Sequence, residues 1–111
     1  MTAYQGGDFS KAIPLLEAVV RSAPGDDDAR FYLGASYALT SRWRDAIEML
    51  RPLLTRRESA YAEEAAFLTA RAYVQLNDVA AAIAALDATI ALDGDRAAEA
   101  RALRARLAAL R

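Results

Sequence analysis

Two acidic runs are the residues of this chain whose types and spacing could carry chemistry. Asp26, Asp27 and Asp28 stand in a row, and Glu63 is followed by Glu64. Carboxylates bind Ca²⁺ in a loop that ends with a Glu at its twelfth position, and the Asp run lacks that pattern. Both runs lie where a helix is expected to begin, and negative charge stabilises the N-terminal end of a helix. We therefore interpret both as helix starts.

The side chains that most often perform catalysis are missing or poorly placed. The chain has no His and no Cys, which excludes thiol nucleophiles, disulfides, His-based acid–base catalysis and ordinary zinc sites. Gly6-Gly7 is not followed by the Gly-Lys-Ser/Thr sequence of a phosphate-binding loop. No pair of carboxylates is placed by the sequence in an apolar pocket. We predict no enzyme activity, no catalytic residues, and no cofactor or metal.

The charge of the chain gives no support for a nucleic-acid ligand. The formal net charge is -1, whereas surfaces that follow phosphates concentrate Lys and Arg. We interpret Arg56-Arg57 as part of a solvated loop. Among the 14 basic residues only Lys11 is a lysine, which we attribute to codon bias in a bacterial source.

No segment of the sequence is suited to a membrane. No apolar run reaches the roughly 18 residues that a membrane-spanning helix needs. Residues 1–20 lack the basic segment followed by an apolar segment that marks a signal peptide. We expect a soluble protein with no membrane insertion, cytoplasmic by default.

Apolar residues recur every three or four positions through most of the chain, which predicts amphipathic helices. Gly6-Gly7 is expected to end a helix tail in residues 1–6. Asp8 and Asp95 are expected to cap later helices by accepting from backbone N–H groups. The expected helices cover residues 9–22, 27–40, 43–54, 60–76, 79–92 and 96–110.

The helices form units that repeat at a nearly fixed period. Ala12-Ile13, Ala46-Ile47 and Ala82-Ile83 hold equivalent places, at spacings of 34 and then 36 residues. A large apolar residue follows each Ala four positions later. The two extra residues are expected in the polar loop at residues 55–59.

This pattern resembles the tetratricopeptide repeat, or TPR, whose first helix carries Leu-Gly-x-x-Tyr and whose second carries an Ala and then a large apolar residue four positions on. The matching residues are Leu33, Gly34, Tyr37, Ala46 and Leu50 in the central unit, Ala12, Leu16 and Pro24 in the first, and Ala70, Tyr73, Ala82 and Leu86 in the third. The sequence departs from the family at Arg30 and Ala66, where Trp is common, at Thr69 for Leu, and at Glu58 and Gly94 for Pro.

The resemblance implies an all-α fold, a right-handed superhelix of antiparallel helical hairpins (a TPR-like α-solenoid) with about two and a half repeats and a C-terminal capping helix. A single domain is expected, with a partial first repeat in residues 1–26, a second in 27–59, a third in 60–94 and the cap in 95–111. Gly34 and Ala46 are small, so the helices that carry them are expected to pack closely. A short coiled-coil dimer is the alternative for the last helix, because Ala100, Leu103, Leu107 and Leu110 also fit that spacing.

The resemblance also implies a binding function, because family members hold protein ligands in a groove formed by the first helices of successive units. The positions that should face this groove are Phe31, Ala35, Ala38, Leu39, Phe67, Leu68, Arg71, Val74 and Gln75. The Lys and Asn clamp that some members use for chaperone C-termini is absent, with Phe31, Ala35, Glu64 and Leu68 in its place. We expect a protein or peptide partner with apolar groups, and Arg71 available to a carboxylate. RNA binding by a pentatricopeptide-like array is a minor alternative that lacks the necessary polar, basic groove.

The N-terminal edge suggests a second function. Only residues 1–6 of a first helix are present, so either the chain is part of a longer repeat protein or another chain covers that edge. We expect an exposed apolar strip of Tyr4, Phe9, Leu16 and Val19, and such strips mark association sites. The alternative function is therefore structural self-assembly, as a homodimer or other homo-oligomer through this edge.

Overall fold

The computed structural model describes residues 9–56 and 58–110, and every regular element in them is an α-helix. The elements are α2 (Phe9–Ser22), α3 (Asp27–Leu39), α4 (Trp43–Leu54), α5 (Ala62–Gln75), α6 (Val79–Ala91) and α7 (Ala97–Ala108). The expected bounds of these helices agree with the structure to within two residues at each end. The expected helix tail at 1–6 and its cap Asp8 lie outside the described residues. None of the described helices is long and apolar enough to cross a membrane.

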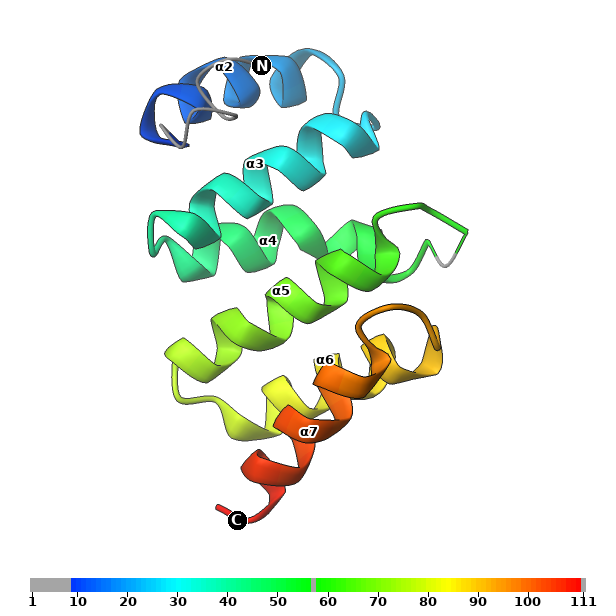
Figure 1. Ribbon diagram of the computed structural model, residues 1–111. Coiled ribbons are helices and arrows are strands. Elements are labelled where there is room, and N and C mark those ends of the chain that lie inside the picture. Colours follow the sequence, from blue (N-terminus) through cyan, green and yellow to red (C-terminus); the bar gives the residue numbers. More distant parts are fainter. Residues whose placement is uncertain (1–8, 57, 111) are drawn as a thin grey trace.

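The helices form a stack in which each packs chiefly on its neighbours in sequence. The stack runs from α2 at one end to α7 at the other (Figure 1) and measures 40 × 27 × 22 Å. The main contact that skips a helix joins α3 to α5, which are the first helices of successive hairpins. Packing between sequence neighbours is typical of helical-repeat proteins, and the predicted all-helical solenoid is confirmed.

Gly34 allows α3 and α4 to approach closely. A Cβ atom at Gly34 would lie 2.5 Å from Cγ and Cδ2 of Leu50, and Leu50 is fully buried in α4. The close packing predicted for this glycine is therefore confirmed, with Leu50 as the side chain that fills the space. In the next hairpin Ala70 and Leu86 hold the equivalent positions, and both are fully buried.

The turns inside both hairpins share one backbone conformation. Ser41 and Asn77 have positive φ angles of 63° and 61°. In each turn the next residue's N–H donates to the carbonyl of Tyr37 or Tyr73, at 2.8 and 2.9 Å. This is the Schellman arrangement, which satisfies carbonyls at the helix end. Asn adopts the left-handed conformation more readily than Ser, because its side chain bonds to the local backbone.

A carboxylate from another helix holds the start of α7. We expected Asp95 to cap this helix, but the N-cap residue is Arg96 and no local side chain caps it. Its backbone N–H donates instead to Oε2 of Glu63 on α5, at 3.1 Å. Gly94 leaves room for this contact, since a Cβ there would lie 2.6 Å from the Glu63 oxygens. The prediction of a local cap was wrong because a tertiary contact replaces it.

The side chain of Arg96 fixes α7 to α5. Its Nε and Nη2 donate to the Glu64 carboxylate at 2.7 and 2.8 Å, and Nη1 donates to Glu99 at 2.8 Å. These hydrogen bonds, first that to Glu64, raise the pKa of Arg96 above its usual range. The guanidinium also lies 5.2 Å from the centre of the Phe67 ring. The acidic pair at the start of α5 thus positions the last helix.

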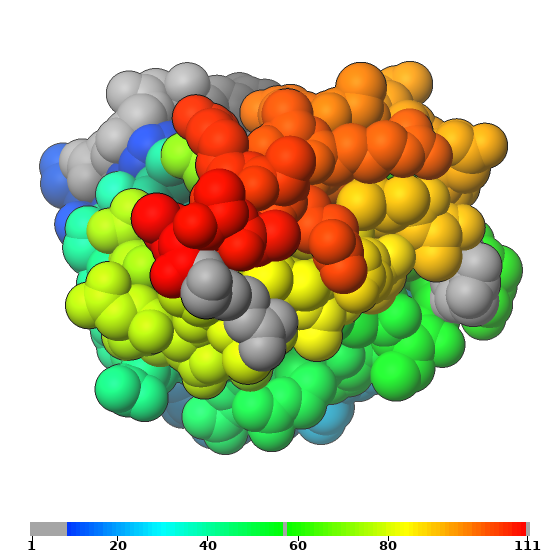
Figure 2. Space-filling view, turned by 90° about the horizontal axis from the view of Figure 1, so that it is seen from below, coloured from blue at the N-terminus to red at the C-terminus, as the bar shows by residue number. Residues whose placement is uncertain are grey.

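The last helix covers the preceding hairpin. Seen from the C-terminal end, α7 lies across α6 and beside α5 (Figure 2). Ala100 and Leu107 are buried against the α5–α6 cluster, and Leu103 is partly buried there. Leu110 lies beyond the helix and is 75% exposed, so its expected place in this apolar stripe was wrong. Most of the stripe packs against α5 and α6 of the same chain, so little apolar surface remains on α7 for a coiled-coil dimer.

Candidate functional site

Each residue of the Asp26-Asp27-Asp28 run has a structural contact. Asp26 caps α3 by accepting from a backbone N–H at 3.1 Å. Asp27 forms an ion pair with Arg56 in the loop after α4. A hydrogen bond to Asp28 raises the pKa of Tyr61, with burial adding to the effect. Within residues 9–56 and 58–110, no three carboxylates are grouped so that they could hold a metal ion.

A first hollow, the α3–α5 hollow, lies between the first helices of the two hairpins. Its volume is about 270 Å³. Leu39 at the end of α3 is 58% exposed, and Leu68 is half-buried on α5. The lining residues are Ala38, Leu39, Ser41, Trp43, Leu68, Arg71 and Gln75. Five of these were expected in the groove from the sequence.

A second hollow, the α5–α7 hollow, lies on the other side of α5, between α5 and α7. Its volume is about 290 Å³. It is more polar than the first, because Glu99 and Arg106 of α7 stand at its edge. The lining residues are Phe67, Arg71, Val74, Gln75, Glu99, Leu103 and Arg106. Arg71 and Gln75 line both hollows and so lie at the middle of the surface.

Three of the expected groove residues are largely or partly buried by packing. Phe67 is 3% exposed and offers little surface to a ligand. Ala35 is buried and lines neither hollow. Phe31 is half-buried, and its ring stacks on Tyr61 with 4.6 Å between the ring centres. The structure thus brings together Ala38, Leu39, Phe67, Leu68, Arg71, Val74 and Gln75, but not Phe31 or Ala35.

The sequence analysis missed residues from a turn and from the last helix. Ser41 belongs to the turn of the hairpin and Trp43 is the first residue of α4, and the groove positions were taken only from the first helices. Glu99, Leu103 and Arg106 belong to α7, which we treated only as a cover. The apolar stripe through Leu103 could have indicated that α7 also borders the groove.

The groove carries positive charge that no described residue neutralises. The guanidinium groups of Arg71 and Arg106 form no ion pair with any residue of 9–56 or 58–110. Glu99, the acidic residue of the α5–α7 hollow, is engaged by Arg96. A free guanidinium beside apolar side chains is suited to a carboxylate on an otherwise apolar ligand.

The predicted self-association strip is only partly exposed. Leu16 is 4% exposed and packs in the core with α3 and α4, so its expected exposure was wrong. Leu15, its neighbour, is 59% exposed, and Val19 is 44% exposed. Phe9 is half-buried, and Tyr4 lies outside the described residues.

Comparison with known proteins agrees with this architecture. The family model described as Anaphase-promoting complex, cyclosome, subunit 3, which is of the tetratricopeptide type, matches residues 5–89. The chain therefore belongs to this repeat family, and the resemblance seen in the sequence is confirmed. No curated protein matches the sequence.

A solved structure shows the same fold over nearly the whole chain. It is the crystal structure of PcrH in complex with the chaperone binding region of PopD. The TM-score is 0.85 at 22% sequence identity, and the match covers 97% of this chain and 84% of PcrH. At this identity the likeness concerns the fold.

Proposed function

We propose that this chain is a protein-interaction module that binds a segment of a partner protein across the α3–α5 and α5–α7 hollows. The observation that carries the proposal is the position of Arg71 and Gln75, which line both hollows. A single bound segment that passes over α5 would contact both hollows at once. Helical-repeat proteins use extended surfaces of this kind for binding.

The chemistry of the two hollows defines the segment. Leu39 and Leu68 offer an apolar contact on one side, and Val74 and Leu103 offer another on the opposite side. Arg71 between them would bind an acidic side chain. The expected ligand is therefore an amphipathic helix or an extended peptide with two apolar residues flanking an Asp or Glu.

The fold comparison supports the general form of this proposal. The structure of PcrH is that of a complex with a binding region of another protein, PopD. A shared fold does not determine a shared ligand, because function depends on the side chains of the site. The segment bound by this chain is accordingly defined by Arg71 and its apolar neighbours.

Peptides selected from a random display library would test the groove. Their affinities would be measured by fluorescence anisotropy for the wild type, Leu68→Asp and Arg71→Glu. Arg44→Glu is the matched charge reversal, because Arg44 is exposed on α4 and lines neither hollow. We expect Arg71→Glu to weaken binding at least about tenfold, or about 1.4 kcal/mol, and Arg44→Glu to leave it unchanged. Peptides that bind Arg71→Glu as tightly as the wild type would contradict the proposal.

Self-association through α2 is the second candidate function. The exposed pair of Leu15 and Val19, one helical turn apart, is the observation that favours it. Light scattering after size exclusion, at several concentrations, would measure the mass of the wild type and of Leu15→Glu with Val19→Glu. A monomer at high micromolar concentration in both cases would eliminate this function.

A further inference from the structure

One position of the repeat, on the second helix of each unit, is acidic in the first and third units and basic in the second. Glu17, Arg51 and Asp87 hold this position, at the same spacings of 34 and 36 residues as the repeats. The Tyr37 hydroxyl donates to Glu17 at 2.6 Å, and Arg104 forms an ion pair with Asp87. Arg51 forms no ion pair with any described residue. The first and last of these interfaces thus have a carboxylate at this position, and the middle interface has the cation of Arg51.

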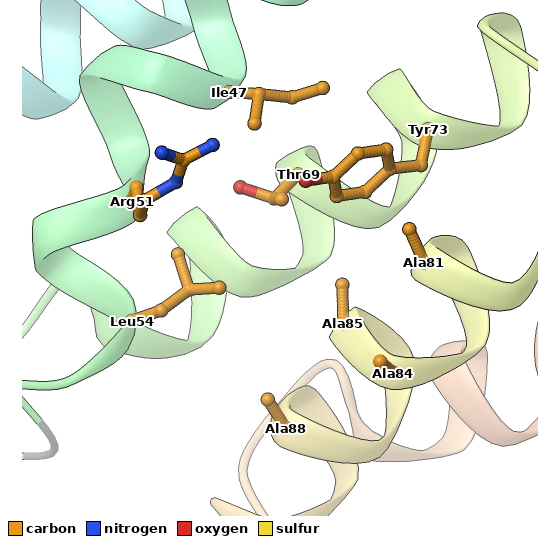
Figure 3. A pocket seen from close by; sticks show the side chains of 9 residues that line it. All are labelled: Ile47, Arg51, Leu54, Thr69, Tyr73, Ala81, Ala84, Ala85 and Ala88. Atoms are coloured by element: carbon orange, nitrogen blue, oxygen red, sulfur yellow. The ribbon is translucent and has the colours of Figure 1, made fainter. Parts of the chain in front are cut away.

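A hollow lies beside Arg51, between α4 and α6, with α5 behind it (Figure 3). We call it the α4–α6 hollow, and its volume is about 250 Å³. Its lining is largely apolar and includes four alanines on one face of α6. The lining residues are Ile47, Arg51, Leu54, Thr69, Tyr73, Ala81, Ala84, Ala85 and Ala88.

The hollow exists because two large side chains of the preceding interface have smaller counterparts here. Met49 packs against the core between α2 and α4, whereas its counterpart one unit later is Ala85. Leu33 is buried in the same core, and its counterpart is Thr69. The first interface is therefore filled by its own side chains, and the second is not.

Thr69 has a buried hydroxyl that pairs with none of the residues that the structure describes. The side chain is 3% exposed, and its Oγ1 makes no hydrogen bond within this part of the chain. The hydroxyls of the buried Ser36 and Thr89, by contrast, donate to the carbonyl four residues earlier at 2.8 and 2.9 Å. An unpaired buried hydroxyl destabilises the folded state, so its retention points to a ligand that bonds to it.

Three polar groups converge at this point. Figure 3 shows the Thr69 hydroxyl directed toward Arg51 and the Tyr73 ring pointing with its hydroxyl into the same hollow. The Tyr73 hydroxyl has no hydrogen-bond partner among the residues that the structure describes. Arg51 is exposed, so its long side chain is free to reorient and admit a ligand atom to Thr69.

We propose that the α4–α6 hollow binds an aliphatic monocarboxylate. Its carboxylate would pair with the Arg51 guanidinium and accept hydrogen bonds from Tyr73 and Thr69, which are all donors. Its hydrocarbon chain would lie on Ala81, Ala84 and the other alanines of α6. The ligand would thus supply the apolar volume and the carboxylate that the first interface has in Met49, Leu33 and Glu17.

The size of the hollow restricts the length of the chain. The hollow is open to solvent, and its volume of about 250 Å³ is several times the roughly 30 Å³ that one water molecule takes up in the liquid. A medium-chain acid such as octanoate can lie along it, and the end of a long-chain acid would extend into solvent. The hollow is also independent of the groove, because Arg71 lines the two groove hollows and not this one.

Isothermal titration calorimetry of the full chain would test the site with octanoate, octanol and octylamine. We expect saturable binding of octanoate with one site and affinity in the millimolar range or tighter, and weaker binding of the other two. Arg51→Gln should weaken octanoate binding at least about tenfold, because the ion pair is lost. Thr69→Leu should abolish binding by filling the hollow while the protein stays folded.

Arg71→Gln is the matched control, since it removes the same charge from the groove side of α5. It should leave octanoate binding unchanged, and chemical-shift changes on titration should centre on Thr69 and Tyr73. Absence of saturation at millimolar octanoate, equal affinity for octanol, or unchanged affinity in Arg51→Gln would each overturn the proposal. None of these outcomes depends on whether peptides bind the groove.

Discussion

The interface of α2 with the α3–α4 hairpin and the interface of α4 with the α5–α6 hairpin have the same architecture but different interiors. In the first, Leu33 is 1% exposed and Tyr37 donates to Glu17. In the second, Thr69 and Tyr73 hold the same places and line a hollow. The repeat pattern therefore determines where helices lie, and a few side chains determine whether the space between them is filled.

The largest effect on stability is expected when Leu33 of the first interface is replaced by Thr, the residue found at the equivalent position 69 of the second. Leu33→Thr would remove a buried apolar side chain and leave a hydroxyl in its place. We expect a loss of about 2–5 kcal/mol in the free energy of unfolding, from the cavity and the unsatisfied group. Urea denaturation followed by circular dichroism would measure it. A loss below about 1 kcal/mol would mean that the first interface is as tolerant as the second.

The contact between α3 and α4 at Gly34 should not tolerate a larger side chain. Gly34→Leu would force a side chain into the space of Leu50, with a cost of roughly 1–3 kcal/mol or more. Gly25→Leu is the control, because a Cβ at Gly25 would meet nothing within 4 Å. A melting temperature of Gly34→Leu within a degree or two of the wild type would contradict the close contact.

The reverse exchange should stabilise the protein. Thr69→Leu would place apolar volume in the α4–α6 hollow and remove an unpaired hydroxyl. We expect a gain of about 1–2 kcal/mol, from apolar burial and the lost desolvation cost. The same urea titration measures it, and a destabilised variant would show that the hollow is too small for the added side chain.

The paired tyrosine should make the first interface sensitive to alkali. Burial and the hydrogen bond to Glu17 raise the pKa of Tyr37 from 10.0 to about 12. The unfolded chain therefore loses this proton at lower pH than the folded chain does. The stability due to Tyr37 is complete below pH 10 and is lost as the pH rises through about 12.

Tyr37→Phe would isolate this contribution. We expect the variant to lose about 1 kcal/mol at neutral pH, as is typical of a hydrogen bond, and to unfold less steeply between pH 10 and 12 than the wild type. Tyr73→Phe is the matched control, because it removes the equivalent hydroxyl where no described residue accepts from it. Identical pH profiles for Tyr37→Phe and the wild type would show that the Glu17 contact contributes nothing.

The smallest expected effect concerns the two hairpin turns. Ser41→Asn would give the first turn the residue that the second turn has at position 77. Because Asn tolerates positive φ better than Ser does, we expect a gain of a few tenths of a kcal/mol, up to about 1. Thermal unfolding would measure this gain. A lower melting temperature would mean that the Ser41 side chain has a role beyond its backbone conformation.

The sequence predicted the features that depend on local chemistry and on period. Helix bounds, the acidic start of α3 at residues 26–28 and the small residue at Gly34 all follow from neighbours within one or two turns. The repeat pattern selected Leu16 rather than its neighbour Leu15, but only the packing on α3 and α4 shows that Leu16 is buried. The Glu63 contact with α7 joins residues that are 33 positions apart, and no local pattern indicates it.

The groove could be predicted in part from the sequence, whereas the α4–α6 hollow could not. Arg71 and Leu68 could be placed from the family pattern, since the repeat aligns first helices. Phe67 could not be assigned to core or groove without the position of Arg96, whose guanidinium lies over its ring. The hollow results from the small side chains of Thr69 and Ala85. No local sequence pattern indicates such a space, and it becomes apparent only when equivalent positions of the repeats are compared.

Packing between sequence neighbours has a kinetic consequence. Because native contacts join helices that are close along the chain, little loop-closure entropy opposes their formation, and folding is expected to be fast. Local opening then spreads from one helix to the next. Among the helices, α5 touches α3, α4 and α6, so its amide hydrogens should exchange with solvent most slowly. The helix that carries both Arg71 and Thr69 would remain ordered while its neighbours open.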